Sequence, residues 1–164
     1  MKYLNIITGD RKIGKTYTAI SHLSNCCKRV VLITDNDRSK QYFLEIIKET
    51  HPEHKAILRD NDIIIRGHQY IPVKTYKLND RDLEIISLAN IVYIDEYSTL
   101  MRLADNDKFI DATKNSDIIV TISNYDMRNK NDIARAVMKF KGKFLTISNL
   151  ECCGELKCGS LYSY

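Results

Sequence analysis

Short apolar runs alternate with amphipathic stretches along most of the chain. Runs that are apolar at nearly every position predict buried strands, at residues 3–8, 29–34, 91–94, 117–123 and 143–148. Apolar positions spaced three and four apart predict helices, at residues 17–27, 39–50, 80–89, 99–113 and 131–140. Buried strands that alternate with helices are typical of a parallel sheet covered on both faces. We therefore expect a three-layer α/β fold with a mainly parallel sheet.

Two segments depart from this alternation. Short apolar runs at residues 63–65 and 70–73 flank Arg66-Gly67-His68-Gln69, which predicts a small hairpin-like insertion near residues 62–77. The Cys-containing tail at residues 151–164 has no hydrophobic period, so we expect it to be irregular. With 164 residues and no repeat or linker, the chain is expected to form one domain over residues 1–164.

The loop between the first predicted strand and the first predicted helix carries the most specific motif. Residues 9–16 match G-x-x-x-x-G-K-[ST] at every fixed position. Glycines let the backbone point N–H groups at phosphates, and the following helix presents its positive end to the same anion. Lys15 would reach the β- and γ-phosphates, and Thr16 would give its hydroxyl to Mg²⁺. We expect ATP to be bound by Gly9, Asp10, Arg11, Lys12, Ile13, Gly14, Lys15, Thr16 and Tyr17.

Two acids follow the apolar run at residues 91–94. Asp95, at the predicted strand end, would hold the Mg²⁺ shell, and Glu96 would polarise the attacking water as a general base. A kinase has less use for a glutamate at this place, because its nucleophile is a substrate group rather than water. The pair therefore favours an ATPase that uses ATP and Mg²⁺.

Asn124 follows the predicted strand at residues 117–123. In ATPases with such an acidic pair, a polar residue at this place contacts the γ-phosphate or the lytic water. Asn124 is the candidate and Ser123 the reserve, while a plain loop role stays open because Asn is common after strands. We expect this strand to lie between the phosphate-loop strand and the strand of Asp95, as in P-loop proteins of the additional-strand, catalytic-glutamate type.

The phosphate loop also carries an arginine, Arg11, four residues before Lys15. This resembles the ATPase domains of viral DNA-packaging motors, the large terminases and the packaging ATPases of small tailed phages. Ile13 and Tyr17 fit the string Gly-Ile-Gly-Lys-[Ser/Thr]-Tyr of the small-phage group, whereas Lys12 departs from it. Asp-Glu-Tyr at residues 95–97 and Ser-Asn at residues 123–124 are similar too.

The resemblance implies that Arg11 approaches the γ-phosphate and assists hydrolysis with Glu96, Lys15 and Asn124. A solvated loop arginine is the alternative. The resemblance also implies a homo-oligomer acting on double-stranded DNA, as a viral protein in a host cytoplasm. Packaging motors usually add a second domain after the ATPase, and this chain ends at Tyr164, so the motor is split over two chains or the task differs.

Charge permits a DNA partner without requiring one. There are 25 basic and 21 acidic residues, a net charge of +4. Arg128 is the best placed arginine for a finger in cis or toward a neighbouring subunit, with a solvated loop residue as the alternative. Basic and aromatic residues of the predicted hairpin would face nucleic acid or simply be solvated: Arg66, His68, Tyr70, Lys74, Tyr76 and Lys77.

Several other classes receive less support. Asn129 to Asp132 spells N-K-x-D, the guanine motif, but does not end a predicted strand, and Asp132 more simply begins a helix. Apolar runs are too short for a bilayer and no signal peptide is evident, so we expect no membrane partner and a cytoplasmic location. Two rival functions stay open, a nucleoside-type kinase and a nucleotide-binding scaffold without turnover.

Five cysteines, an odd number in a chain without an export signal, indicate reduced thiols rather than a disulfide framework. Three of them lie in the tail, at Cys152, Cys153 and Cys158, in a spacing that faintly resembles a zinc knuckle. Zinc sites usually pair cysteines as C-x₂₋₄-C, and no second clear pair exists. Thymidine kinases combine a phosphate loop with zinc cysteines, but their cysteine pairs are cleaner, so metal binding by the tail stays open.

Overall fold

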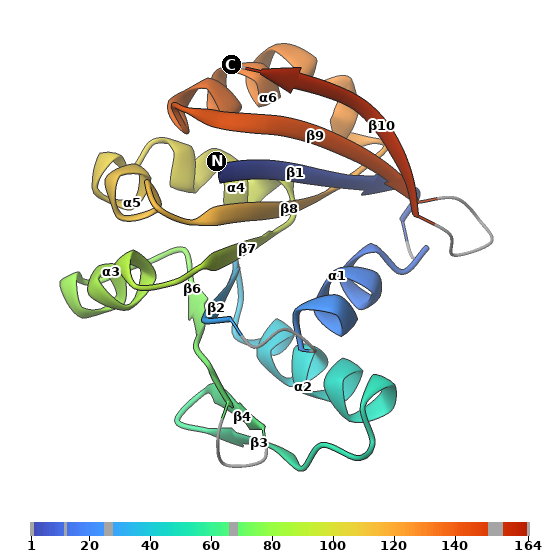
Figure 1. The fold of residues 1–164 in the computed structure, drawn as a ribbon, viewed down its shortest axis with the longest axis vertical. Helices are drawn as coiled ribbons and strands as arrows, with labels where there is room; N and C mark the ends of the chain where they lie inside the picture. Colours follow the sequence, from blue (N-terminus) through green and yellow to red (C-terminus); the bar gives the residue numbers. More distant parts are fainter. Residues whose placement is uncertain (1, 12, 25–27, 66–68, 151–155, 164) are drawn as a thin grey trace.

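A seven-stranded sheet runs through the molecule (Figure 1). The structure is a computed structural model that describes residues 2–11, 13–24, 28–65, 69–150 and 156–163. The strand order is β10-β9-β1-β8-β7-β2-β6, and all neighbours pair in parallel except β10 with β9. The strands are β1 (Lys2–Gly9), β2 (Val30–Thr34), β6 (Val73–Thr75), β7 (Ile91–Asp95), β8 (Asp117–Ser123), β9 (Lys143–Leu150) and β10 (Leu156–Ser163). The predicted α/β fold with a mainly parallel sheet is confirmed.

Strand β8 lies between β1 and β7, as predicted for the additional-strand type. In the register, Gly9 of β1 faces Ser123 of β8, and Asp95 of β7 faces Thr121 of β8. The ends of three strands that are distant in sequence therefore meet at one edge of the sheet. This is the edge at which ligands bind in open parallel sheets.

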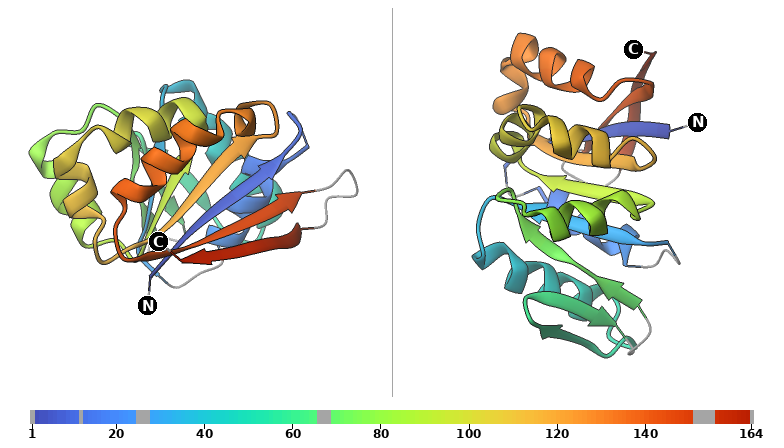
Figure 2. Two further views of the ribbon diagram at one scale, coloured as in Figure 1. Left: turned by 90° about the horizontal axis from the view of Figure 1, so that it is seen from above. Right: turned by 90° about the vertical axis from the view of Figure 1, so that its left-hand side faces the viewer.

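Helices cover both faces of the sheet (Figure 2). Helices α1 and α2 pack on one face, and α3, α4, α5 and α6 pack on the other. Their bounds are α1 (Lys15–Leu23), α2 (Arg38–Thr50), α3 (Asp80–Ser87), α4 (Tyr97–Ala104), α5 (Asp107–Ala112) and α6 (Lys130–Lys139), with a 3₁₀ turn η1 (Asp126–Arg128). Alternate residues of one strand enter the two layers: Val92 and Ile94 face α3–α6, and Tyr93 faces α1 and α2.

The predicted helix at residues 99–113 is two helices. Asn106 interrupts it with an extended backbone, and its side chain accepts a hydrogen bond from the N–H of Phe109 at 3.1 Å. An Asn in this position caps a new helix start, so α4 ends at Ala104 and α5 begins at Asp107. The uninterrupted apolar period concealed this break, because Leu103 and Phe109 belong to the same buried layer.

The predicted hairpin is part of a separate three-stranded antiparallel sheet. It contains β3 (Ala56–Arg59), β4 (Asp62–Ile65) and β5 (Gln69–Ile71). Asp60 and Asn61, with φ of 51° and 66°, form the two-residue turn between β3 and β4, as expected of tight hairpins. The predicted second strand at residues 70–73 is divided, because β5 ends before Pro72 and the chain then enters the main sheet as β6.

The tail, expected to be irregular, contains a strand. Residues 156–163 form β10, which pairs antiparallel with β9. An uncovered β9 would present unpaired backbone groups at the sheet edge, and β10 satisfies them. Among the described residues, no helix combines the length and apolar character needed to cross a bilayer.

Candidate functional site

The phosphate loop joins β1 to α1, and two of its glycines are structurally required. Gly14 has φ of 96° and immediately precedes α1, in a conformation that side chains rarely adopt. A Cβ at Gly9 would lie 2.9 Å from Cγ2 of Ile13 and 3.1 Å from the carbonyl oxygen of Leu150. Lys12 lies outside the described residues. The loop therefore brings its backbone close to β9 while α1 presents its N-terminus, a favourable place for an anion.

Lys15 begins α1 and reaches back over the loop. Its Nζ donates to the carbonyl oxygen of Asp10 at 2.8 Å. Burial lowers the pKa of Lys15, while the negative charges of Asp10, Asp95 and Glu96 act in the opposite direction. The ammonium is thus placed between the loop and the acidic pair, where a phosphate would also be held.

Asp95 accepts hydrogen bonds from hydroxyl groups of three elements. Its Oδ1 lies 2.7 Å from the hydroxyl of Tyr93, 3.0 Å from Oγ1 of Thr121 and 3.2 Å from Oγ1 of Thr16. Burial raises the pKa of this carboxyl, and the hydroxyl donors oppose that rise. A hydroxyl and a carboxylate side by side are hard oxygen ligands that fit Mg²⁺. Thr16 and Asp95 are thus the residues that would hold this ion.

Glu96 has an unusual backbone. Its φ of 76° and ψ of 155° fall in a region occupied almost only by glycine. Its N–H lies 3.3 Å from Oγ1 of Thr121, which ties this conformation to β8. Partial burial raises the pKa of its carboxyl, and the charges of Asp95, Asp35 and Asp126 raise it further. Strain of this kind is found at functional sites, where surrounding structure holds it in place.

A cavity of about 470 Å³ lies over these groups. Its lining residues come from the loop, α1, α2, the ends of β7 and β8, and η1: Arg11, Gly14, Lys15, Thr16, Tyr42, Glu96, Thr121, Ser123 and Asp126. Five residues expected from the sequence to bind or cut ATP are among them, and Asp95 is hydrogen-bonded to the lining residue Thr16. Gly9, Asp10, Ile13, Tyr17 and Asn124 are not among the lining residues.

Asn124 and Ser123 lie beside the loop in different ways. The side-chain amide of Asn124 donates to Oδ1 of Asp10 at 3.0 Å, and its backbone N–H donates to the carbonyl of Gly9 at 2.8 Å. Ser123 lines the cavity and its hydroxyl donates to Oδ2 of Asp126 at 3.1 Å. In this structure Asn124 is therefore bound to the phosphate loop, and Ser123 faces the cavity.

Two arginines stack on one tyrosine beside the cavity. The guanidinium of Arg11 lies 5.3 Å from the ring centre of Tyr125, and that of Arg128 lies 4.6 Å from it. All three residues are exposed. The electron-rich face of an aromatic ring attracts cations, so Tyr125 holds both arginines at the rim of the cavity.

Asp35 and Tyr42 were not found by the sequence reasoning. Asp35 follows β2 and accepts a hydrogen bond from the hydroxyl of Ser98 at 3.3 Å. Tyr42 of α2 lines the cavity, and burial, with the charge of Asp95 next, raises the pKa of its phenol. The sequence did carry an indication for Asp35, because this acid directly follows an apolar run, as Asp95 does, whereas Tyr42 lies in a helix with an ordinary period.

Other sequence candidates have structural partners. Asp132 lies in the first turn of α6, forms an ion pair with Arg135 and accepts a hydrogen bond from the Tyr97 hydroxyl at 3.4 Å. The N-K-x-D string therefore forms the start of α6. Cys26, Cys27, Cys152 and Cys153 lie outside the described residues, as do Arg66 and His68, and the side chain of Cys158 is not described.

Two of the hairpin residues expected near nucleic acid also have partners within the protein. Lys74 is mostly buried and lies 3.6 Å from both Asp62 and Asp82. The Tyr70 hydroxyl donates to the buried Asp62, and burial with this hydrogen bond raises the pKa of Tyr70 to about 12. These contacts join the small sheet to the main sheet. They leave Lys77 as the exposed basic residue of this described group.

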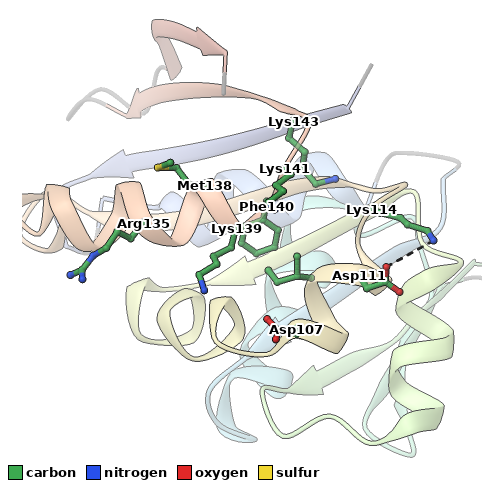
Figure 3. A pocket seen from close by; sticks show the side chains of 10 residues that line it. Asp107, Asp111, Lys114, Arg135, Met138, Lys139, Phe140, Lys141 and Lys143 are labelled. Carbon is green, nitrogen blue, oxygen red and sulfur yellow. Dashed lines mark ion pairs between the residues drawn. The ribbon is translucent and has the colours of Figure 1, made fainter.

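A second cavity, of about 650 Å³, is lined mainly by residues of α5, α6 and the start of β9 (Figure 3). Its basic side chains diverge, with Arg135 pointing to one side and Lys141 to the other. Lys143, which is buried, donates instead to the carbonyls of Thr113 at 2.9 Å and Ser116 at 2.6 Å. The cations of this cavity therefore do not converge on a common point.

No protein-family model matches the chain, and no curated protein matches it. Among solved structures, the VirB11 ATPase from the Brucella suis type IV secretion system, in complex with sulphate, is similar with a TM-score of 0.46 and 9% identity. The match covers 99% of this chain and 50% of that one, so this chain spans about half its length. At this similarity the likeness supports no argument, and the assignment of a P-loop fold rests on this chain's own strand order and phosphate loop.

Proposed function

We propose that this chain hydrolyses ATP with Mg²⁺ at the cavity over the phosphate loop. The observation that supports this most is the contact between Thr16 and Asp95, 3.2 Å apart, with Glu96 beside Lys15 in the same cavity lining. The residues for phosphate binding, metal binding and water activation thus belong to one site. This combination is what P-loop hydrolases require.

Each residue has a distinct role in this proposal. The loop N–H groups and the N-terminus of α1 bind the phosphates, and Lys15 neutralises their charge. Thr16 and Asp95 hold Mg²⁺, which offsets charge on the phosphate oxygens when bound. Glu96 takes a proton from the attacking water, and its raised pKa makes it a stronger base than an ordinary glutamate.

The structure also supports ATP over GTP in this proposal. Reading of guanine by N-K-x-D requires a free aspartate at a strand end. Asp132 instead lies in the first turn of α6, forms an ion pair with Arg135 and accepts a hydrogen bond from Tyr97. We therefore expect no preference for GTP in turnover measurements.

Phosphate release from ATP with Mg²⁺ tests the proposal. Lys15→Ala should abolish nucleotide binding, and wild-type protein with ATP alone should release phosphate. Release that requires a nucleoside acceptor would instead support a kinase. Tight ATP binding without release, with DNA present or absent, would support a scaffold. Either result would overturn the hydrolase proposal.

We further propose that turnover is coupled to double-stranded DNA by a homo-oligomer of the viral packaging type. What supports this is the arginine at position 11, the net charge of +4 and the exposed Arg128 at the rim of the site. Phosphate contacts would make DNA binding weaken with salt, by a log–log slope of about −0.9 per phosphate neutralised. A protein that stays monomeric with an ATP analogue, and whose turnover ignores DNA at low salt, would contradict this coupling but leave the ATPase intact.

A further inference from the structure

We propose that His51, Glu53 and His54 form a Zn²⁺ site at the end of α2, apart from the nucleotide cavity. These residues belong to a short turn that starts where α2 ends, with His51 as the residue after its last helical position. The N–H of His54 donates to the carbonyl of His51 at 2.9 Å, which closes the turn. One turn therefore presents two imidazoles and a carboxylate to the same point.

The distances fit a small tetrahedral ion. One ligand atom from each residue lies within 4.8 Å of the others. Oε1 of Glu53 is 3.6 Å from Nδ1 of His51 and 3.8 Å from Nε2 of His54. Zinc binds such atoms at about 2.0–2.1 Å in a tetrahedron, which places ligand atoms about 3.3 Å apart. Shifts of a few tenths of an ångström would bring Oε1 of Glu53 to this spacing from each ring nitrogen, and the two ring nitrogens, which lie within 4.8 Å of each other, would have to approach to the same spacing.

The hydrogen bonding of His51 prepares it as a ligand. Its Nε2 lies 3.0 Å from the carbonyl oxygen of Ser21 in α1. A carbonyl only accepts hydrogen bonds, so Nε2 carries the proton and the lone pair of Nδ1 faces Glu53. Metal-binding histidines usually donate their second nitrogen in this way, which fixes the ring.

The ring of His54 can also bind a metal. Its Nδ1 is buried and has no hydrogen-bond partner within the described part of the chain. A neutral ring with its proton on Nδ1 leaves the Nε2 lone pair for a metal. The rings of His51 and His54 lie 5.2 Å apart between centres, which lets both approach one ion.

The ligand types favour zinc over magnesium. Two nitrogens and one carboxylate oxygen suit Zn²⁺, whereas Mg²⁺ prefers oxygen ligands and retained water. Three protein ligands leave one tetrahedral position for water. The zinc would join the end of α2 to α1 through the His51 hydrogen bond to Ser21, and we expect it to raise the thermal midpoint.

Zinc alone, added to the full chain after chelation, is the probe. The measurement is a competition titration with a chromophoric chelator. Glu53→Gln and His54→Asn should each lower the affinity for one zinc ion per chain at least about tenfold, because even the loss of a residue that only supports a metal ligand costs that much. His22→Ala removes an exposed histidine of α1 outside the group and should leave the titration unchanged. Zinc bound by cysteines alone would instead give the same titration for the wild type and all three variants.

Ring signals of the wild-type histidines locate the ion independently of any variant. In NMR spectra, zinc should shift the ring resonances of His51 and His54 and leave those of His22 in place. Identical titrations for wild type, Glu53→Gln and His54→Asn would overturn the proposal. So would unshifted His51 and His54 signals at saturating zinc. Neither measurement depends on ATP turnover.

Discussion

The hydroxyl of Thr16 donates to Oδ1 of Asp95 over 3.2 Å and thereby joins the first turn of α1 to the end of β7. The two residues are 79 positions apart in the chain, and they meet because β8 separates β1 from β7 by one strand. This geometry holds a hydroxyl and a carboxylate together at the place that we propose for Mg²⁺.

Removal of the Thr16 hydroxyl should affect the metal requirement. Thr16→Val keeps the shape of the side chain and removes one oxygen ligand, so the Mg²⁺ concentration for half-maximal turnover should rise. Thr18→Val changes the same residue type two positions later in α1 and should leave that concentration unchanged. Turnover measured across a Mg²⁺ titration checks this. An equal response of the two variants would argue against Thr16 as a ligand.

Glu96 should be needed for turnover but not for binding. Glu96→Gln removes the base while keeping the size of the side chain, so phosphate release should fall by about 10²–10⁴-fold. ATP affinity should stay close to that of the wild type, because the phosphate loop is unchanged. Glu84→Gln, at an exposed position of α3, is the matched control. Comparable loss of ATP affinity and turnover in Glu96→Gln would count against this role.

The acid limb of the pH profile should report the raised pKa of Glu96. The base acts when deprotonated, so turnover should fall as the pH drops through a value above the ordinary glutamate pKa of about 4.3. The charge of Asp35 contributes to this rise. Asp35→Asn should therefore move the acid limb to lower pH. An acid limb that stays in place, or moves upward, would show that Glu96 is not the group that titrates.

The backbone of Glu96 should store measurable strain. At φ of 76° and ψ of 155°, glycine is tolerated and other residues cost about 1–3 kcal/mol. Glu96→Gly should therefore be more stable than Glu96→Ala, the reverse of the usual order in a helix. At Glu84, inside α3, alanine should be the more stable of the two by about 0.5–1 kcal/mol. Free energies of unfolding from denaturant titrations decide between these outcomes.

Sequence predicts those parts of the site that depend on adjacent residues. The phosphate loop is one contiguous motif, and Asp95 with Glu96 ends an apolar run, so both appear without a structure. The place of β8 between β1 and β7 was predicted because Asn124 follows a strand of its own, as in ATPases with a catalytic glutamate. Local spacing and one topological rule are enough for predictions of this kind, and the strand order confirms the topological one.

The remaining features depend on tertiary contacts. Tyr42 lines the cavity because α2 packs beside α1, and no periodicity indicates which exposed residue of a helix faces a ligand. Thr121 holds Asp95 only because the register places the two opposite each other. The start of a new helix at Asn106 was visible as a capping residue, yet the continuous apolar pattern outweighed it.

Arg128 should act on the ATP of a neighbouring subunit, if the oligomer of the proposed function forms. Its guanidinium lies 4.6 Å from the ring centre of Tyr125, at the exposed rim of the cavity, and is absent from the cavity lining. Arg128→Ala and Lys15→Ala should each be inactive alone. Mixed together, they should regain turnover, because the Lys15→Ala subunit supplies Arg128 to an intact phosphate loop next to it. Arg102 of α4 also stacks on a tyrosine, but on Tyr76 at 4.3 Å rather than on Tyr125 at the rim, so Arg102→Ala should keep wild-type turnover. Turnover of the mixture equal to the sum of its parts would place any action of Arg128 within its own subunit, since complementation requires a group that works across an interface.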